Sequence, residues 1–470
     1  MNNNQPTLLW HDYETWGANP ASDKPAQFAA IRTDMDLNII GEPIEYYCRL
    51  PLDYLPAAEA MFVTGITPQK ANRLGEVEAQ FIAKVHAQMA QPNTCTVGYN
   101  SIRFDDEVTR YSLYRNFFDP YAREWQHGNS RWDIIDLVRA CYALRPEGIE
   151  WPEREEGVPS FKLEHLTVAN GLAHENAHDA VSDVKATIAL AKLIKEKQPK
   201  LYDYYFGLRK KQAVAPQIDI LGLKPLLHVS SMFPAANGCA SLILPMAWHP
   251  HNSNAVICVD LKQDPTPLLE WDAETLKTKL YQKTSERPAG EPRVPLKLVH
   301  LNKSPFIAPA SSLEDENAER LGLDKAGCRE HYKLLRQHHQ AVREKLHQIY
   351  DDQPTGDNTK PVDQQLYGGF FSDADRAQIE LVRNCHPSNL AALTPQFTDP
   401  RLAPMLFLYR ARNYPETLSE PEQLRWQEHC KQALSDPEYI YHLEQLFEQH
   451  SSDEHKTSLL KALGNYLQGL

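Results

Sequence analysis

The chain has 470 residues, 42% of them hydrophobic and 24% charged, which is enough for two to three domains with sizeable cores. Its formal net charge of −13 excludes a protein that coats nucleic acid over its whole surface, although it permits a local basic channel. Because it has no leader-like start, no apolar run able to cross a bilayer and no Cys-x-x-Cys pair among its eight cysteines, we expect a cytoplasmic protein with free thiols.

The first informative stretch is the apolar run from Leu8 to Thr15, which carries two acids at Asp12 and Glu14. If the run is a strand, alternate residues face the same side, so the two carboxylates lie together. Burying two like charges is unfavourable unless a cation lies between them. A lone Asp-x-Glu is more often a pair of acids on a solvated edge strand, and that alternative stays open here.

The next elements complete a sheet and begin its helices. Residues 30–50 alternate apolar and polar positions around Gly41 and Pro43, which predicts two more strands in an antiparallel meander. Thr67 is expected to cap a helix that begins at Pro68. A further helix is expected over residues 76–89 and a short strand over residues 94–99.

Three consecutive acids, Asp105, Asp106 and Glu107, open the following helix. Acids in the first turn can simply complement the helix dipole. Asp105 nevertheless follows Phe104 at the carboxyl end of a strand, where ligand sites of α/β sheets are found. It is therefore a candidate site residue.

Aromatic and arginine residues are interleaved between residues 110 and 139. Rings stack on bases and guanidinium groups meet phosphates, so this pattern is typical of single-stranded nucleic acid binding. Each aromatic taken singly is more often a core residue, because these side chains bury much area.

His178 and Asp183 lie five residues apart before an apolar-periodic helix that ends at Pro199. On one continuous helix they would be about 140° apart. Asp179 is a good N-cap residue, which would leave His178 on the loop and Asp183 in the first turns, so that both can converge on one site. A lone histidine near a helix start is usually only a surface residue.

The remainder of the chain changes character twice. A linker is expected at residues 201–216, followed by β-rich sequence with strands near 240–244, 255–261 and 294–301, and by a helical stretch over 324–350. The polar segment 351–361 marks a second boundary. Helical periods at 373–384, 405–413, 421–434 and 437–470 predict an all-helical end.

Taken together, four acids and one histidine suggest metal-assisted hydrolysis. Carboxylates bind Mg²⁺ or Mn²⁺, and two such ions can clamp the attacking and leaving oxygens of a phosphodiester. A nearby histidine can take the proton of the attacking water.

The segments Asp-x-Glu, Asn-x-x-x-Phe-Asp and His-x4-Asp resemble the three motifs of the histidine-bearing subclass of the DEDD exonuclease superfamily, and nearly the whole chain resembles bacterial exonuclease I. The resemblance implies an α/β, ribonuclease-H-like exonuclease domain with a mixed sheet (1–198), a Src-homology-3-like β-barrel domain with a helical appendage (199–353) and an all-α C-terminal domain (354–470). It also implies processive 3′-to-5′ degradation of single-stranded DNA to 5′-mononucleotides, with a role in DNA repair and recombination.

The same resemblance implies roles for individual residues. Two Mg²⁺ ions, or Mn²⁺, would be held by Asp12, Glu14, Asp105 and Asp183, with His178 as general base. Single-stranded DNA would meet Glu14, Arg110, Tyr121, Trp125, Arg139 and Lys162. The acidic C-terminal tail of single-stranded DNA-binding protein would meet Arg145, Lys224 and Arg336, although Glu314 stands where a basic residue is expected. A monomer without membrane contact is expected.

Two alternatives remain. A 3′-to-5′ RNA exonuclease of the same superfamily would use the same metal chemistry, but small RNA trimmers need neither of the two additional domains. A non-catalytic single-strand-binding module would be expected to lack an acid or the histidine, and all five are present.

Overall fold

The computed structural model describes residues 5–172, 179–283, 286–288, 290–351 and 359–470. They fall into two compact units. The first contains the described residues up to 130, from 179 to 187 and from 359 onward, and the second contains the described residues of 131–172 and 188–351. Among the described helices, none has the length and apolar character needed to cross a membrane.

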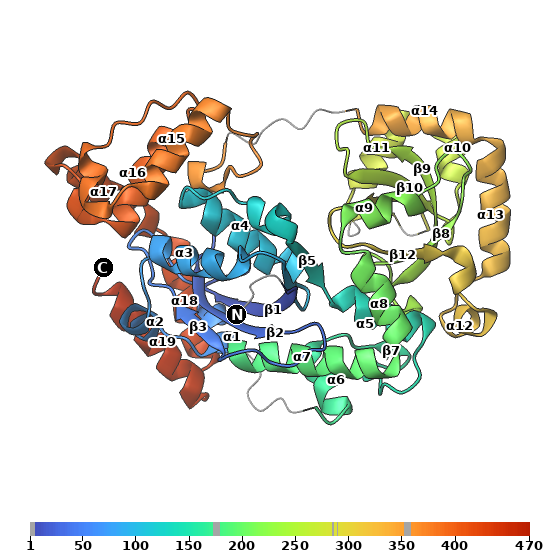
Figure 1. Ribbon diagram of the computed structural model, residues 1–470, viewed down its shortest axis with the longest axis horizontal. Coiled ribbons are helices and arrows are strands. Elements are labelled where there is room, and N and C mark those ends of the chain that lie inside the picture. The colour runs from blue at the N-terminus through green and yellow to red at the C-terminus, as the bar shows by residue number, and fades with distance from the viewer. Residues whose placement is uncertain (1–4, 173–178, 284–285, 289, 352–358) are drawn as a thin grey trace. The chain divides into compact units, whose positions relative to one another are not determined.

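A five-stranded sheet in the order β3-β2-β1-β4-β5 forms the centre of the N-terminal part of the chain (Figure 1). Strand β1 (Thr7–Thr15) pairs antiparallel with β2 (Pro25–Thr33) and parallel with β4 (Thr94–Gly98), so the sheet is mixed as predicted. β3 (Ile44–Tyr47) and β5 (Ser130–Asp133) form its edges. The expected meander is confirmed, but β2 begins at Pro25 rather than near residue 30, because its first half is apolar and pairs with β1.

Three helices of the first unit follow the expected local signals. They are α2 (Pro68–Leu74), α3 (Glu78–Met89) and α4 (Asp105–Arg115). Helix α1 (Ala58–Thr64) was not expected from the sequence. The Thr67 side chain accepts a hydrogen bond from the Lys70 amide at 3.2 Å, with Pro68 in the first turn, which confirms the predicted cap. The apolar face of α3 packs on β1 and β2 in a core that includes Phe81 and Val85.

The end of the chain is all-helical, as predicted. Its main helices are α15 (Asp373–Asn384), α16 (Leu402–Asn413), α17 (Glu420–Leu434), α18 (Pro437–Gln449) and α19 (Glu454–Leu467). The expectation of one helical period over 437–470 was wrong. Asp453 starts a new helix there, because its carboxylate accepts the Lys456 amide at 3.0 Å.

A buried ionic network ties these helices to Asp53, which follows β3, and to Lys24, which directly precedes β2. Arg412 of α16 donates to Asp53 at 2.8 Å and to Asp363 at 2.7 Å. Lys24 lies 3.4 Å from Asp363, and His429 lies 2.9 Å from Asp53. Burial alone would raise the pKa of both carboxyl groups, but the surrounding cations hold both pKa values well below their usual range.

The second unit is built on an antiparallel sheet in the order β11-β10-β9-β8-β12. Its strands are β8 (Leu226–Val229), β9 (Ala240–Trp248), β10 (Ala255–Asp260), β11 (Leu296–His300) and β12 (Phe306–Pro309). The sequence pattern missed β8 and β12. Both span four residues, too few to show a clear alternation.

Helices and a small hairpin complete this unit. The hairpin pairs β6 (Glu153–Glu155) with β7 (Val158–Pro159). The helices are α5 (Ile135–Leu144), α6 (Leu163–Ala169), α8 (Pro199–Gly207), α9 (Lys211–Val214), α10 (Thr266–Glu270), α11 (Ala273–Tyr281), α12 (Asp315–Arg320), α13 (Lys325–Gln337) and α14 (His339–Ile349), together with most of α7 (Ala180–Lys197). The single helix expected over 324–350 is therefore two, separated at His338.

We expect His228 of β8 to make the stability of this unit depend on pH. Burial lowers its pKa to about 3, and its Nδ1 hydrogen bonds to the Phe306 carbonyl at 2.8 Å. Between about pH 6.5 and 3 only the unfolded chain binds this proton, so the free energy of unfolding falls as pH falls, by about 1.4 kcal/mol per pH unit. Urea titrations between pH 7 and 4 should show this slope in wild type and a shallower one in His228→Gln. Equal slopes would contradict the assignment.

Candidate active site

Strand β1 and helix α7 bring three of the predicted carboxylates together. Asp12 and Glu14 alternate along β1 and share a face, and Asp183 lies in the first turn of α7. Ligand oxygens of these three residues all lie within 4.8 Å of one another. The fold thus brings together Asp12 and Asp183, which are about 170 residues apart in the sequence.

Asp105 joins the same region through β1. It is the first residue of α4 and is buried, and its Oδ1 accepts the Tyr13 amide at 3.1 Å. Because Tyr13 lies between Asp12 and Glu14, this hydrogen bond fixes the start of α4 against the acidic part of β1. The Asp105 charge also contributes to raising the pKa of Asp12.

The electrostatics of this cluster favour a bound cation. Burial, followed by the charges of Asp105, Glu14 and Asp183, raises the pKa of Asp12 well above its usual value. Burial and the neighbouring acids, Asp183 foremost, raise the pKa of Glu14 to about 8. A divalent cation would offset both the desolvation and the repulsion. A set made only of carboxylate oxygens suits Mg²⁺ or Mn²⁺, so the residues present fit such an ion.

The start of α7 follows the predicted capping geometry. The Asp179 carboxylate accepts the Ser182 amide at 3.1 Å, and the Asp183 amide donates to the Asp179 carbonyl at 2.9 Å. Asp179 therefore sets the position of Asp183 in the first turn. His178, the predicted general base, lies outside the described residues.

The predicted substrate residues of the first unit differ in how accessible they are to a ligand. Arg110 is buried, and it donates to Glu124 from Nε at 2.7 Å and to Glu107 from Nη1 at 2.7 Å. Its guanidinium lies 5.2 Å from the centre of the Tyr121 ring. The Trp125 side chain is 66% exposed. Trp125 is thus open to a ligand, whereas Arg110 is engaged by carboxylates and supports Tyr121.

Two further predicted substrate residues, Arg139 and Lys162, belong to the second unit. Arg139 donates to Asp136 at 2.7 Å. Lys162 is exposed and lies 3.3 Å from Glu164.

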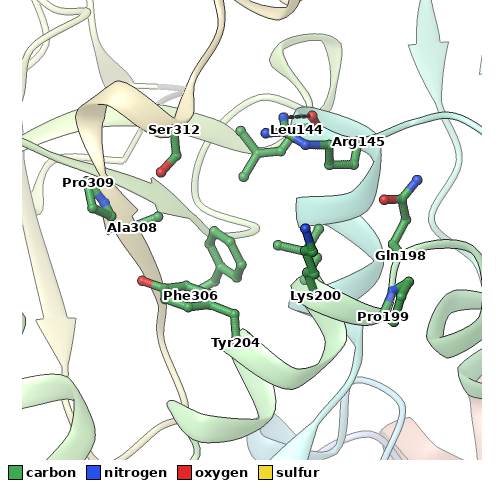
Figure 2. A pocket seen from close by; sticks show the side chains of 11 residues that line it. Leu144, Arg145, Gln198, Pro199, Lys200, Tyr204, Phe306, Ala308, Pro309 and Ser312 are labelled. Carbon is green, nitrogen blue, oxygen red and sulfur yellow. Dashed lines mark hydrogen bonds between the residues drawn. The ribbon is translucent and has the colours of Figure 1, made fainter.

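The predicted partner residue Arg145 lines a pocket of about 450 Å³ in the second unit (Figure 2). Lys200 and the rings of Tyr204 and Phe306 also line it. Lys224 and Arg336 are exposed and are not among its described lining residues. Glu314 pairs with Arg145 at 2.9 Å, which explains how an acid is accommodated where a base was expected. Sequence reasoning missed Lys200, Tyr204 and Phe306, since no short motif joins them.

Three protein-family models match successive parts of the chain. They are Exonuclease over residues 9–191, Exonuclease I SH3-like domain over 209–352 and Exonuclease I C-terminal domain over 360–470. An exodeoxyribonuclease I of Escherichia coli (strain K12) is 53% identical over 469 residues, covering 99% of this chain and 98% of that protein. The chain belongs to the exonuclease I family.

Other members of the exonuclease I family agree with this assignment. The exodeoxyribonuclease I of Haemophilus influenzae is 49% identical, covering 97% of each chain. Among solved structures, E. coli exonuclease I in complex with a dA16 oligonucleotide matches with a TM-score of 0.96 at 52% identity, covering 99% of this chain and 100% of that one. The fold is therefore an exonuclease domain followed by an SH3-like domain and a C-terminal helical domain.

Two more exonuclease I structures resemble the chain at 52% identity. The zinc ion bound form of the E. coli ExoI–ssDNA complex has a TM-score of 0.94 and covers 99% of both chains. SSB/exonuclease I in complex with the inhibitor CFAM has a TM-score of 0.93 and covers 99% of this chain and 100% of that one.

Proposed function

We propose that this exonuclease degrades single-stranded DNA processively from the 3′ end, releases 5′-mononucleotides, and acts in DNA repair and recombination in the cytoplasm. The observation that carries the proposal is the half-buried cluster of Asp12, Glu14 and Asp183, whose oxygens lie within 4.8 Å of one another. The 53% identity to E. coli exodeoxyribonuclease I supports the substrate, and the E. coli structure with dA16 supports single-stranded DNA as ligand.

Divalent metal is the expected cofactor of this site. We assign two Mg²⁺ ions, with Mn²⁺ as a substitute, to Asp12, Glu14, Asp105 and Asp183. When bound, the ions would activate water and neutralise charge that develops on the phosphate. The chain's own part is to hold four carboxylates in one place through β1, α4 and α7 and to keep them ionised around the cations.

We assign the proton transfer to His178, which precedes the Asp179 cap of α7. A neutral imidazole there would accept the proton of the attacking water at Nδ1 or Nε2. His178→Ala should lower the single-turnover rate about 10²- to 10⁴-fold, the usual size of a general-base contribution. Affinity for single-stranded DNA, measured in EDTA, should stay within about twofold of wild type.

The matched control for that variant is His455→Ala, which removes an exposed histidine of α19. The control should cleave at the wild-type rate. An unchanged rate for His178→Ala would mean that another group accepts the proton.

For the protein partner, we propose that the acidic C-terminal tail of single-stranded DNA-binding protein docks at the pocket that Arg145 lines, with Lys224 and Arg336 as further basic contacts. The structure of SSB/exonuclease I with an inhibitor supports such an association for the E. coli relative. We propose that the chain acts as a monomer with domains at 1–198, 199–353 and 354–470.

The deciding experiment uses one strand labelled at its 3′ end and one at its 5′ end, as DNA and as RNA, with Mg²⁺ and with EDTA. Metal-dependent release of the 3′ label as mononucleotide, on DNA and much less on RNA, is expected. Preference for RNA would favour the RNA exonuclease instead. Absence of digestion on either strand would indicate a binding module.

A further inference from the structure

Helix α4 has a buried ion pair at each of its two ends. At the start, the Arg123 guanidinium donates to Asp106 from Nη2 at 2.8 Å, and both side chains are at most 2% exposed. At the end, Arg115 donates from Nε to both carboxylate oxygens of Glu78 at 2.8 and 2.9 Å, and this pair is buried as well. The two pairs lie about 13 Å apart along the helix axis. They share their chemistry and burial but differ in what lies next to them.

The pair at the start of α4 adjoins the acidic cluster. Asp106 directly follows Asp105, one of the proposed metal ligands, and both belong to the first turn of the helix. The Asp105 carboxylate accepts the Tyr13 amide at 3.1 Å, which aligns it with β1. A rotation of the first turn about the helix axis moves both carboxylates together, because they are attached to successive residues of one turn. The contact that holds Asp106 therefore also sets the direction of the Asp105 carboxylate.

Arg123 is anchored to the sheet as well as to the helix. Its Nη1 donates to the Thr96 hydroxyl of β4 at 3.3 Å, so one guanidinium joins β4 to the first turn of α4. The planar group presents its N–H donors in fixed directions, so two contacts define an orientation that a single contact would leave open. The first turn of α4 is thereby held against the strand that pairs with β1.

The chain around Arg123 also carries predicted substrate residues. Arg123 lies between Tyr121 and Trp125 in the sequence. The next residue, Glu124, accepts from Arg110 of α4 at 2.7 and 2.9 Å. Two adjacent residues thus hold this segment against the first two turns of α4. Of the two, Arg123 is the one that pairs with the residue next to Asp105.

We propose that Arg123 is a positioning residue for the nuclease reaction: it orients the Asp105 carboxylate for metal binding and ties it to residues 121–125. The inference rests on the proposed nuclease function. Residues that hold a metal ligand without touching the metal change metal affinity by about 10- to 100-fold when they are removed. The pair of Arg115 with Glu78, at the far end of α4, contributes to stability alone and so provides a matched control.

The test removes both charges of a pair at once, because a single deletion would leave an unpaired charge in the interior. Arg123→Met with Asp106→Leu is compared with Arg115→Met with Glu78→Leu in the full-length protein. Each double substitution leaves the net charge unchanged, so the long-range attraction for a cation stays the same. Without DNA, Mn²⁺ titration followed by electron paramagnetic resonance should show about tenfold weaker binding in the first variant and a change of less than about twofold in the second.

Mononucleotide release and thermal melting give further readouts. The Mg²⁺ concentration for half-maximal rate should rise about tenfold in the variant without the Arg123 pair, and saturating Mg²⁺ should restore part of the rate. The variant without the Arg115 pair should change in melting temperature only. Arg123→Lys keeps the charge but loses the planar fork, so it should shift Mn²⁺ affinity and the Mg²⁺ midpoint in the same direction by a smaller factor.

Equal Mn²⁺ affinities of the two double variants would overturn the positioning role, because the Arg123 pair would then act on stability alone. If the double variant at Arg123 does not fold, Arg123→Lys decides, and wild-type Mn²⁺ affinity with a wild-type Mg²⁺ midpoint in that variant would also overturn it. Wild-type protein that binds Mn²⁺ but releases no mononucleotide with Mg²⁺ would contradict the nuclease function instead.

Discussion

Asp183→Asn lowers the nuclease rate about 10⁴-fold, the largest loss of activity that we expect from a single substitution. It removes the negative charge from one of three carboxylates whose oxygens lie within 4.8 Å of one another. Metal ions contribute several kcal/mol to phosphoryl chemistry, and each 1.36 kcal/mol corresponds to a factor of ten in rate. The measurement is mononucleotide release under single-turnover conditions with saturating protein.

The same variant separates a metal role from a structural one. In EDTA, Asp183→Asn should melt at or above the wild-type temperature, because it relieves the repulsion that raises the pKa of Glu14. Mg²⁺ should raise the melting temperature of wild type by mass action and leave that of the variant nearly unchanged. Glu196→Gln, an exposed acid of the same helix, should behave as wild type. Retained activity in Asp183→Asn would refute the metal assignment.

Arg412→Met should cost about 3–5 kcal/mol of stability, the largest structural effect that we predict, because it leaves two buried carboxylates without their shared cation. Arg412 contacts Asp53 at 2.8 Å and Asp363 at 2.7 Å, and its own side chain is only 12% exposed. Urea unfolding followed by circular dichroism measures the loss. Arg376→Met breaks an exposed pair with Asp373 and should cost less than about 1 kcal/mol.

The pH dependence of the stability lost in Arg412→Met provides a second check. The folded-state pKa values of Asp53 and Asp363 are depressed, so their contribution to stability is present above the unfolded pKa of about 3.9 and disappears as pH falls below it. The difference between wild type and Arg412→Met should therefore narrow from pH 7 to pH 3. A constant difference would show that Arg412 stabilises mainly through packing.

Local chemistry made much of the site predictable. The period of a strand places Asp12 and Glu14 on one face, and the capping preference of aspartate places Asp183 in the first turn of α7. That these residues meet could not be derived from spacing, because their proximity depends on how the whole fold brings the first turn of α7 to β1. The expectation that these residues form one site came from the resemblance to a family.

The errors in the fold have a common physical origin. β8 pairs with the next strand, β9, and with β12, which lies far along the chain, and four residues carry too little pattern to reveal either β8 or β12. The break at His338 occurs without glycine or proline, so no local signal marks it. The loop at 366–371 shows its turn in Gly368 and Gly369, but its backbone is held by Arg401, 32 residues beyond Gly369, which donates to the Gly369 carbonyl at 3.0 Å.

The core that contains Trp16 has a consequence for synthesis on the ribosome. Trp16, Met61 and Ile66 are covered by Leu459, Leu460 and Leu463 of α19. Translation proceeds at about 5–20 residues per second, so roughly 20 to 90 seconds separate the emergence of Trp16 from that of α19. During that interval the nascent nuclease domain exposes an apolar face, so a ribosome stalled before α19 would carry a chain prone to capture by chaperones or proteases.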